Sequence, residues 1–152
     1  MSLVIYGIDH SPLKVTPIGN RMYKIADPVH IAIHTSEGTL VLDIKPYFVT
    51  NFRSGGRLVD GIVDQMGDEN KALIYLIHDC LYTPCVACNN HHPISKELAD
   101  IILREGLKFY GMHPIKAELV YQSVRIFGRS AYEEDDIWTP TNSTLFSFNW
   151  VA

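Results

Sequence analysis

The feature that most constrains the fold is a change in the spacing of apolar residues along the chain. In the segment VHIAIH, Val29, Ile31 and Ile33 alternate with polar or small residues, which is the period of two expected of a half-buried strand. From about Leu58 onward the apolar spacing becomes helical. Strands followed by helices in this order predict an α+β fold.

Two neighbouring segments, 21–27 and 38–44, have the same β character, so an N-terminal antiparallel meander is expected. The residues TSEG lie between two of these runs and predict a hairpin loop. Gly55 and Gly56 predict a loop or turn after the meander. The segment 145–151 again alternates aromatic and polar residues, which indicates a closing C-terminal strand.

The middle of the chain predicts three to four helices. They are expected over 57–66, over 68–82, over 95–111 and from Pro114 onward. Gly61 weakens the first, whereas Ser95 is a suitable N-cap for the third and Pro114 a preferred first residue for the fourth. In the fourth, apolar residues recur at the spacing of an amphipathic helix. The acidic, proline-containing segment 132–143 is expected to be a surface loop.

Length, charge and composition limit the class of protein. A chain of 152 residues is long enough for one core and short for two, so a single α+β domain over 1–152 is expected. A formal net charge of -4 supplies no basic face to displace the counterions of nucleic acid. No apolar run reaches the roughly 20 residues that cross a bilayer, and the N-terminal segment lacks the pattern of a signal peptide.

All three cysteines of the chain lie between Asp79 and Ser95. Cys85 and Cys88 have the C-x2-C spacing that lets two thiolates reach one zinc ion. Cys80 and either His91 or His92 would complete a Cys3His set. All of these ligands come from one short stretch, however, whereas zinc fingers ordinarily combine two separated pairs. The interpretation we favour is a loop without metal, in which Cys80 is a small buried apolar residue.

His78 and Asp79 end one expected helix, and Asp100 lies on the next. Consecutive helices usually pack as neighbours, so these three side chains are candidates for a divalent-metal or acid–base centre. The alternative is a buried polar network in which a carboxylate orients a histidine. From the spacing alone, the network is the favoured interpretation.

Other polar residues allow more than one interpretation. Arginines near the glycine turn could clamp a phosphate or carboxylate, or they could be solvated or paired with nearby acids. The basic residues concerned are Lys45, Arg53, Arg57 and Arg125. His30 and His34 lie four residues apart on one strand, a separation of about 13 Å, and are expected to be surface histidines.

Four groups of residues occur in a fixed order along the chain: Thr50, Phe52, Ser54 and Arg57; His78, Asp79, Leu81 and Tyr82; Ala99 and Asp100; and Tyr121, Val124, Arg125 and Gly128. They match four motifs, TDFASIPR, HDxLY, AD and Y-x-x-V-R-x-x-G. In this order the motifs resemble a family of tailed bacteriophages and prophages, the domain of unknown function 1353, and the resemblance spans roughly residues 44–132.

The resemblance marks His78, Asp79 and Asp100 as family features and leaves the cysteines outside the pattern. It also makes Asn51, Arg57, Tyr82 and Arg125 candidate ligand-binding residues. Where the family motif has an aspartate, this chain has Asn51, and Gly56 replaces the proline of the motif. An amide brings no charge and cannot serve as a base, so catalysis is less expected here than in relatives.

The resemblance therefore implies a phage-encoded, non-catalytic protein of the virion or of its assembly. It would be made in the host cytoplasm, and its partners would be other phage structural proteins or further copies of itself, without nucleic acid. One alternative is a hydrolase that uses a divalent metal held by His78, Asp79 and Asp100. Another is an accessory protein that binds a host target. The sequence alone does not decide whether the chain is an enzyme or whether it holds zinc.

Overall fold

The computed structural model describes residues 3–51, 69–133 and 138–151. The strands are β1 (Ile5–His10), β2 (Val15–Gly19), β3 (Met22–Ile25), β4 (Val29–Thr35), β5 (Gly38–Ile44), β6 (Val49–Thr50) and β7 (Phe146–Val151). The helices are α2 (Glu69–Leu81), the 3-10 helix η1 (Val86–Cys88), α3 (Lys96–Phe109), α4 (Pro114–Phe127), α5 (Arg129–Glu133) and α6 (Thr139–Asn142). The helix predicted over 57–66 and the turn predicted at Gly55 and Gly56 lie outside the described residues.

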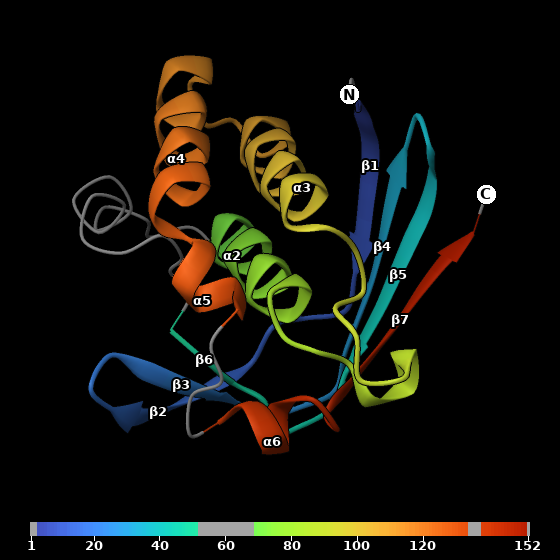
Figure 1. Ribbon diagram of the computed structural model, residues 1–152, viewed down its shortest axis with the longest axis vertical. Coiled ribbons are helices and arrows are strands. Elements are labelled where there is room, and N and C mark those ends of the chain that lie inside the picture. Colours follow the sequence, from blue (N-terminus) through green and yellow to red (C-terminus); the bar gives the residue numbers. More distant parts are fainter. Residues whose placement is uncertain (1–2, 52–68, 134–137, 152) are drawn as a thin grey trace.

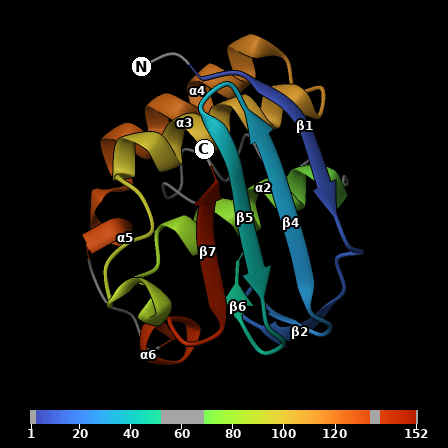
Figure 2. The same cartoon turned by 90° about the vertical axis from the view of Figure 1, so that its right-hand side faces the viewer.

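The main sheet consists of four antiparallel strands in the order β1-β4-β5-β7 (Figure 2). β4 and β5 form the predicted hairpin, in which Thr35 pairs with Gly38 at the turn. Ile31, Ile33 and Leu42 are fully buried, because alternate side chains of a strand point to the same face of a sheet. The α+β fold is confirmed, with its N-terminal antiparallel strands, its helices and its closing C-terminal strand.

The other three strands form a smaller sheet in the order β2-β3-β6. β3 pairs with β2 on one side and β6 on the other, so it does not continue the ladder of β4. Pro28 lies between β3 and β4, and proline has no N–H to donate to a ladder. The N-terminal strands therefore divide between two sheets.

The helices cover one face of the main sheet (Figure 1, Figure 2). α3 packs beside α2 and contacts β1, and α4 packs on α3 farther from the sheet. The residues from Leu73 to Ile77 are fully buried, so the middle of α2 is surrounded by protein on all sides, while the start of its first turn is exposed. The predicted starts of α3 and α4 are confirmed, whereas α3 ends at Phe109, before the predicted end at residue 111. Ser95 accepts a hydrogen bond from the Leu98 backbone at 3.2 Å, and Pro114 begins α4. Within the described ranges, no helix is long and apolar enough to cross a membrane.

The surface loop predicted over 132–143 is wrong in part, because α6 occupies residues 139–142. Pro140 lies in the first turn of α6, where proline is well tolerated. The polar Asn142 is buried, and its side-chain oxygen and nitrogen bond the N–H and C=O of Val49, each at 3.0 Å. This side chain therefore attaches α6 to β6. The polar composition of the segment predicted a loop and did not indicate that one of its polar residues is buried.

Asn142→Ala is expected to lower the free energy of unfolding by about 1–2 kcal/mol, because it leaves the N–H and C=O of Val49 without this partner. Chemical denaturation monitored by circular dichroism measures the change. Asn149→Ala, on the exposed side of β7, is the matched control and is expected to change the same quantity by less than about 0.5 kcal/mol. Equal effects of the two substitutions would contradict the anchoring role of Asn142.

Candidate functional site

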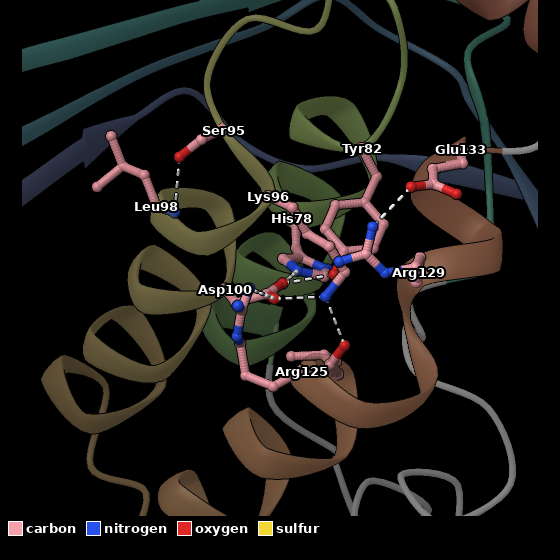
Figure 3. Close-up of polar contacts among 10 residues, drawn as sticks. His78, Tyr82, Ser95, Lys96, Leu98, Asp100, Arg125, Arg129 and Glu133 are labelled. Carbon is pink, nitrogen blue, oxygen red and sulfur yellow. Dashed lines mark hydrogen bonds and ion pairs between the residues drawn. The ribbon is translucent and has the colours of Figure 1, made fainter.

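The centre of the candidate site is a single carboxylate, that of Asp100 on α3, and three helices supply its partners. His78 and Tyr82 come from α2 and the residue that follows it, Lys96 from the first turn of α3, and Arg125 from α4. The pairs 78/82 and 96/100 are each four residues apart, which places both members on one side of the chain. Figure 3 shows the four side chains pointing toward Asp100.

Both oxygens of the carboxylate are fully used. Oδ1 accepts hydrogen bonds from His78 Nε2 at 2.8 Å and from the Tyr82 hydroxyl at 2.5 Å. Oδ2 accepts from Lys96 Nζ at 2.8 Å and from Arg125 Nη1 at 3.1 Å. Because a carboxylate has about four acceptor positions, Asp100 has none left for another donor or for a metal.

The centre is shielded from solvent at its middle and less so at its rim. The side chains of His78 and Asp100 are 0% exposed, whereas that of Lys96 is 10% and that of Arg125 34% exposed. Lys96 Nζ also donates to the carbonyl of Val124 on α4, at 2.8 Å. The two cations therefore close the centre from outside and link α3 to α4.

Burial and hydrogen bonding act in opposite directions on the two buried ionisable groups. Burial alone raises the pKa of Asp100, but hydrogen bonds from His78, Lys96 and Tyr82 outweigh it and hold that pKa below its usual value. Burial lowers the pKa of His78, and the hydrogen bond to Asp100 opposes this shift without reversing it. The stable state is therefore an ionised Asp100 beside a neutral His78 whose Nε2 carries the proton, since a carboxylate only accepts.

Tyr82 is the second neutral donor of the centre. Burial and its hydrogen bond to Asp100 raise the pKa of Tyr82, so the hydroxyl keeps its proton and donates. The ring lies 4.1 Å from that of His78 and 5.2 Å from that of Tyr132, between centroids. This packing fixes the hydroxyl on the carboxylate.

Asp79, the third residue of the predicted centre, makes contacts on another side of α2. Its carboxylate accepts a hydrogen bond from the Thr50 hydroxyl on β6, and its carbonyl accepts one from Thr83 at 2.8 Å. Among the described residues, no three His, Cys, Asp or Glu side chains are placed to hold one metal ion. The structure thus brings His78 and Asp100 together but does not add Asp79 to them as a third ligand.

The four candidate zinc ligands are not gathered either. Cys80 and Cys85 are buried, and the Cys85 thiol donates to the Phe146 carbonyl at 3.6 Å. Burial and the neighbouring Cys85 raise the pKa of Cys88 to about 11, which keeps this thiol protonated near neutral pH. His91 is exposed and pairs with Cys85 through the backbone.

His92, the alternative fourth zinc ligand, has a different use. Its Nε2 lies 2.7 Å from the carbonyl of Tyr132 and 3.1 Å from that of Tyr82, and its ring stacks on Tyr132 at 3.8 Å between centroids. These contacts tie the connection between α2 and α3 to α5.

The other predicted site residues are dispersed. Arg53 and Arg57 lie outside the described residues, and Asn51 and Lys45 are exposed. His30 and His34 lie on the open face of the main sheet, where they pair with Asp43 at 2.5 Å and Asp9 at 2.9 Å. Of the two basic residues in this set that the structure describes, Lys45 and Arg125, Arg125 reaches the Asp100 centre.

Lys96 is the partner of Asp100 that the sequence analysis missed. Its position offered a signal, because a lysine four residues before an aspartate on a helix can bond to it. The same spacing is common on solvated helix faces, however, so it indicates an ion pair without indicating burial.

Gly128 fits closely against the centre. A Cβ atom at this position would lie 2.8 Å from the Tyr82 hydroxyl and 2.4 Å from the Val124 carbonyl oxygen. Gly128→Ala is therefore expected to displace Tyr82 from Asp100 and to lower the free energy of unfolding by about 1–3 kcal/mol, measured by chemical denaturation. Gly7→Ala, where the added atom meets only an ordinary 3.7 Å contact, is the control, and an equal effect there would contradict the close fit.

The comparison with known proteins matches a part of the chain that contains most of this centre. A family model described as "Protein of unknown function (DUF1353)" matches residues 25–124. This range includes His78, Tyr82, Lys96 and Asp100 and ends one residue before Arg125. No curated protein and no solved structure matches the chain.

Proposed function

The chain belongs to the DUF1353 family, and from this premise we propose that it is a non-catalytic protein of a tailed phage, with a role in the virion or its assembly. It is made in the host cytoplasm and acts through contacts with other phage structural proteins or with its own copies. The phage context comes from the motif order described above. The contacts of Asp100 support the absence of catalysis.

The observation that carries this proposal is the saturation of Asp100. A general base needs a free lone pair, and a metal ligand must direct one at the ion. All four acceptor positions of Asp100 are used by His78, Tyr82, Lys96 and Arg125. For Asp100 to react, one of these four donors would have to leave it, and a buried charge or a buried polar group would lose its partner, which is unfavourable.

The same contacts explain what the centre does instead. Asp100 on α3 bonds to α2 through His78 and to α4 through Arg125, while Lys96 bonds the Val124 carbonyl of α4. One carboxylate therefore fixes the mutual position of three helices. A rigid arrangement of helices suits a protein whose function is to present a constant surface.

Asn51 gives independent support. The family motif has an aspartate where this chain has an asparagine, and Asn51 is exposed in the structure. If relatives use that carboxylate in a reaction, this chain has lost its charge and its capacity to act as a base.

Mass spectrometry of purified particles from the phage or prophage that encodes the chain tests the proposal, together with deletion of its coding sequence. The expected result is either the protein in the particle or a block in assembly after deletion. Absence of the protein from particles that assemble normally without it would overturn the proposal. Hydrolase activity lost in a folded His78→Gln variant would overturn it in favour of the metal-dependent alternative.

A further inference from the structure

Helix α4 has apolar residues on two opposite faces. Ala117, Val120 and Val124 face inward and are fully buried. On the opposite side Ile115, Leu119 and Ile126 are 67%, 51% and 66% exposed. A surface helix normally has polar residues on its outer face, and adjacent large apolar side chains in solvent mark an interaction surface.

The outer residues have a spacing of their own. Ile115, Leu119, Gln122 and Ile126 follow one another at intervals of four, three and four residues, the a/d spacing of a helix that packs against another helix. We name these four residues the outer stripe.

The outer stripe is also symmetric about its midpoint, between residues 120 and 121. When such a helix meets an antiparallel copy of itself, Ile115 faces Ile126 of the second copy and Leu119 faces Gln122. Both contacts occur twice, which is the self-complementary contact that a two-fold axis requires. We propose that the outer stripe of α4 is a self-association surface, on which a second copy of this chain packs antiparallel across a two-fold axis.

The charged residues beside the outer stripe favour the antiparallel direction. Glu118 and Arg125 lie on the same flank of the stripe, and their side chains are 48% and 34% exposed. In the antiparallel pair, Glu118 of one copy lies opposite Arg125 of the other, again twice. In a parallel pair in register, Glu118 lies opposite Ser123 instead, and this attraction is lost.

The expected association is weak. A contact made by one helix of 14 residues lies at the low end of protein interfaces, below roughly 1,200 Å² of total buried area. The polar Gln122 in the stripe, whose amide donates to Glu118 at 3.0 Å, weakens it further. Gln122→Leu is therefore expected to tighten the dimer, because an apolar side chain then faces Leu119 of the second copy.

Sedimentation analysis of the full chain over a wide concentration range tests the proposal. A reversible monomer–dimer equilibrium is expected for the wild-type chain. Ile115→Lys and Ile126→Glu are each expected to weaken it by at least about tenfold, because each places two charges in the apolar contact. A mixture of these two variants is expected to recover association, since the two introduced charges are opposite in sign and face each other across the contact.

Tyr6→Glu, at a position 69% exposed on β1, is the control and is expected to leave the equilibrium unchanged. A monomer at all concentrations, or a dimer indifferent to Ile115→Lys and Ile126→Glu, would overturn the proposal. Failure of the mixture to recover association would overturn the antiparallel direction. A third outcome would also overturn the proposal: a monomeric chain in which Ile115→Lys and Ile126→Glu lower the melting temperature far more than Tyr6→Glu does. That result would mean that the outer stripe packs against its own chain. None of these outcomes depends on whether the protein acts in a phage particle.

Discussion

Asp100→Asn is expected to lower the free energy of unfolding by about 3–5 kcal/mol, the usual effect of removing one partner from a buried ion pair. The asparagine has nearly the same shape, so no cavity accounts for the loss. Its amide group, however, brings donors to a position already surrounded by donors from His78, Tyr82, Lys96 and Arg125. At least one donor loses its acceptor, and the two cations lose their counter-charge.

Urea denaturation of both chains at neutral pH measures this difference. The matched control is Asp43→Asn, which removes the carboxylate of an exposed pair with His30. Exposed ion pairs contribute between about 0 and 1 kcal/mol. The control is therefore expected to lower the free energy of unfolding by less than about 1 kcal/mol. If Asp100→Asn were as mild as Asp43→Asn, the carboxylate would not be the link between the helices.

The stability of the wild-type chain is expected to fall as the pH is lowered through the range just below 6.5, and His78 is the cause. Burial lowers the pKa of His78 in the folded protein, whereas in the unfolded chain this residue titrates near 6.5. Below about pH 6.5 His78 becomes protonated in the unfolded chain but stays neutral in the folded chain until its lower folded pKa is reached. The free energy of unfolding then falls by up to about 1.4 kcal/mol per pH unit until the folded pKa is reached.

His78→Gln is expected to remove this part of the pH dependence, because glutamine can still donate to Asp100 but does not titrate. The free energy of unfolding, measured by denaturation at a series of pH values from neutral to mildly acidic, shows the difference. His30→Gln on the exposed face of the main sheet is the control and is expected to retain the wild-type fall. A fall that persists unchanged in His78→Gln would mean that another group is responsible.

Asp100 contributes to the pH dependence in the same direction at lower pH. Its folded pKa lies below the usual value, so its contribution to stability is complete above the unfolded pKa of about 3.9. That contribution is lost as the pH falls through the folded pKa. The free energy of unfolding is therefore expected to fall over two pH ranges, first through His78 and then, at lower pH, through Asp100.

Much of the fold follows from local patterns. The alternation in β4, β5 and β7, the N-cap Ser95 of α3 and the first residue Pro114 of α4 depend on neighbours in sequence, so the sequence alone predicts them. It also predicts β3 as a strand but not its partners, since pairing depends on which distant segment offers an edge. α6 was missed because its anchor, Asn142, bonds to Val49, which lies 93 residues earlier in the chain.

In the candidate site too, features set by local sequence were predicted and features set by distant contacts were not. The prediction paired His78 with Asp100 because consecutive helices usually pack as neighbours. In the structure His78 Nε2 lies 2.8 Å from Asp100 Oδ1. Asp79 was grouped with them because it adjoins His78 in sequence. Adjacent residues on a helix point about 100° apart, however, and Asp79 turns toward Thr50 on β6. Convergence of Lys96 and Arg125 on one carboxylate depends on how three helices pack, which spacing within any one of them does not encode.

The buried ionic centre at Asp100 affects how strictly the arrangement of the helices is defined. Apolar side chains of similar volume can match or exceed the stability of a buried ion pair. Apolar contacts tolerate small shifts, however, whereas hydrogen bonds to one carboxylate do not. The four hydrogen bonds of Asp100 therefore favour one arrangement of α2, α3 and α4.

Under the proposed phage role, the yield of infectious particles from a phage that encodes His78→Gln tests most directly whether the Asp100 centre is structural and not reactive. The amount of folded protein in the same lysate is measured alongside. We expect the particle yield to follow the amount of folded protein, because glutamine keeps a donor for Asp100. General acid–base catalysis contributes about 10²–10⁴-fold to a rate. A loss of yield of that order with the folded protein at its wild-type level would contradict a structural role.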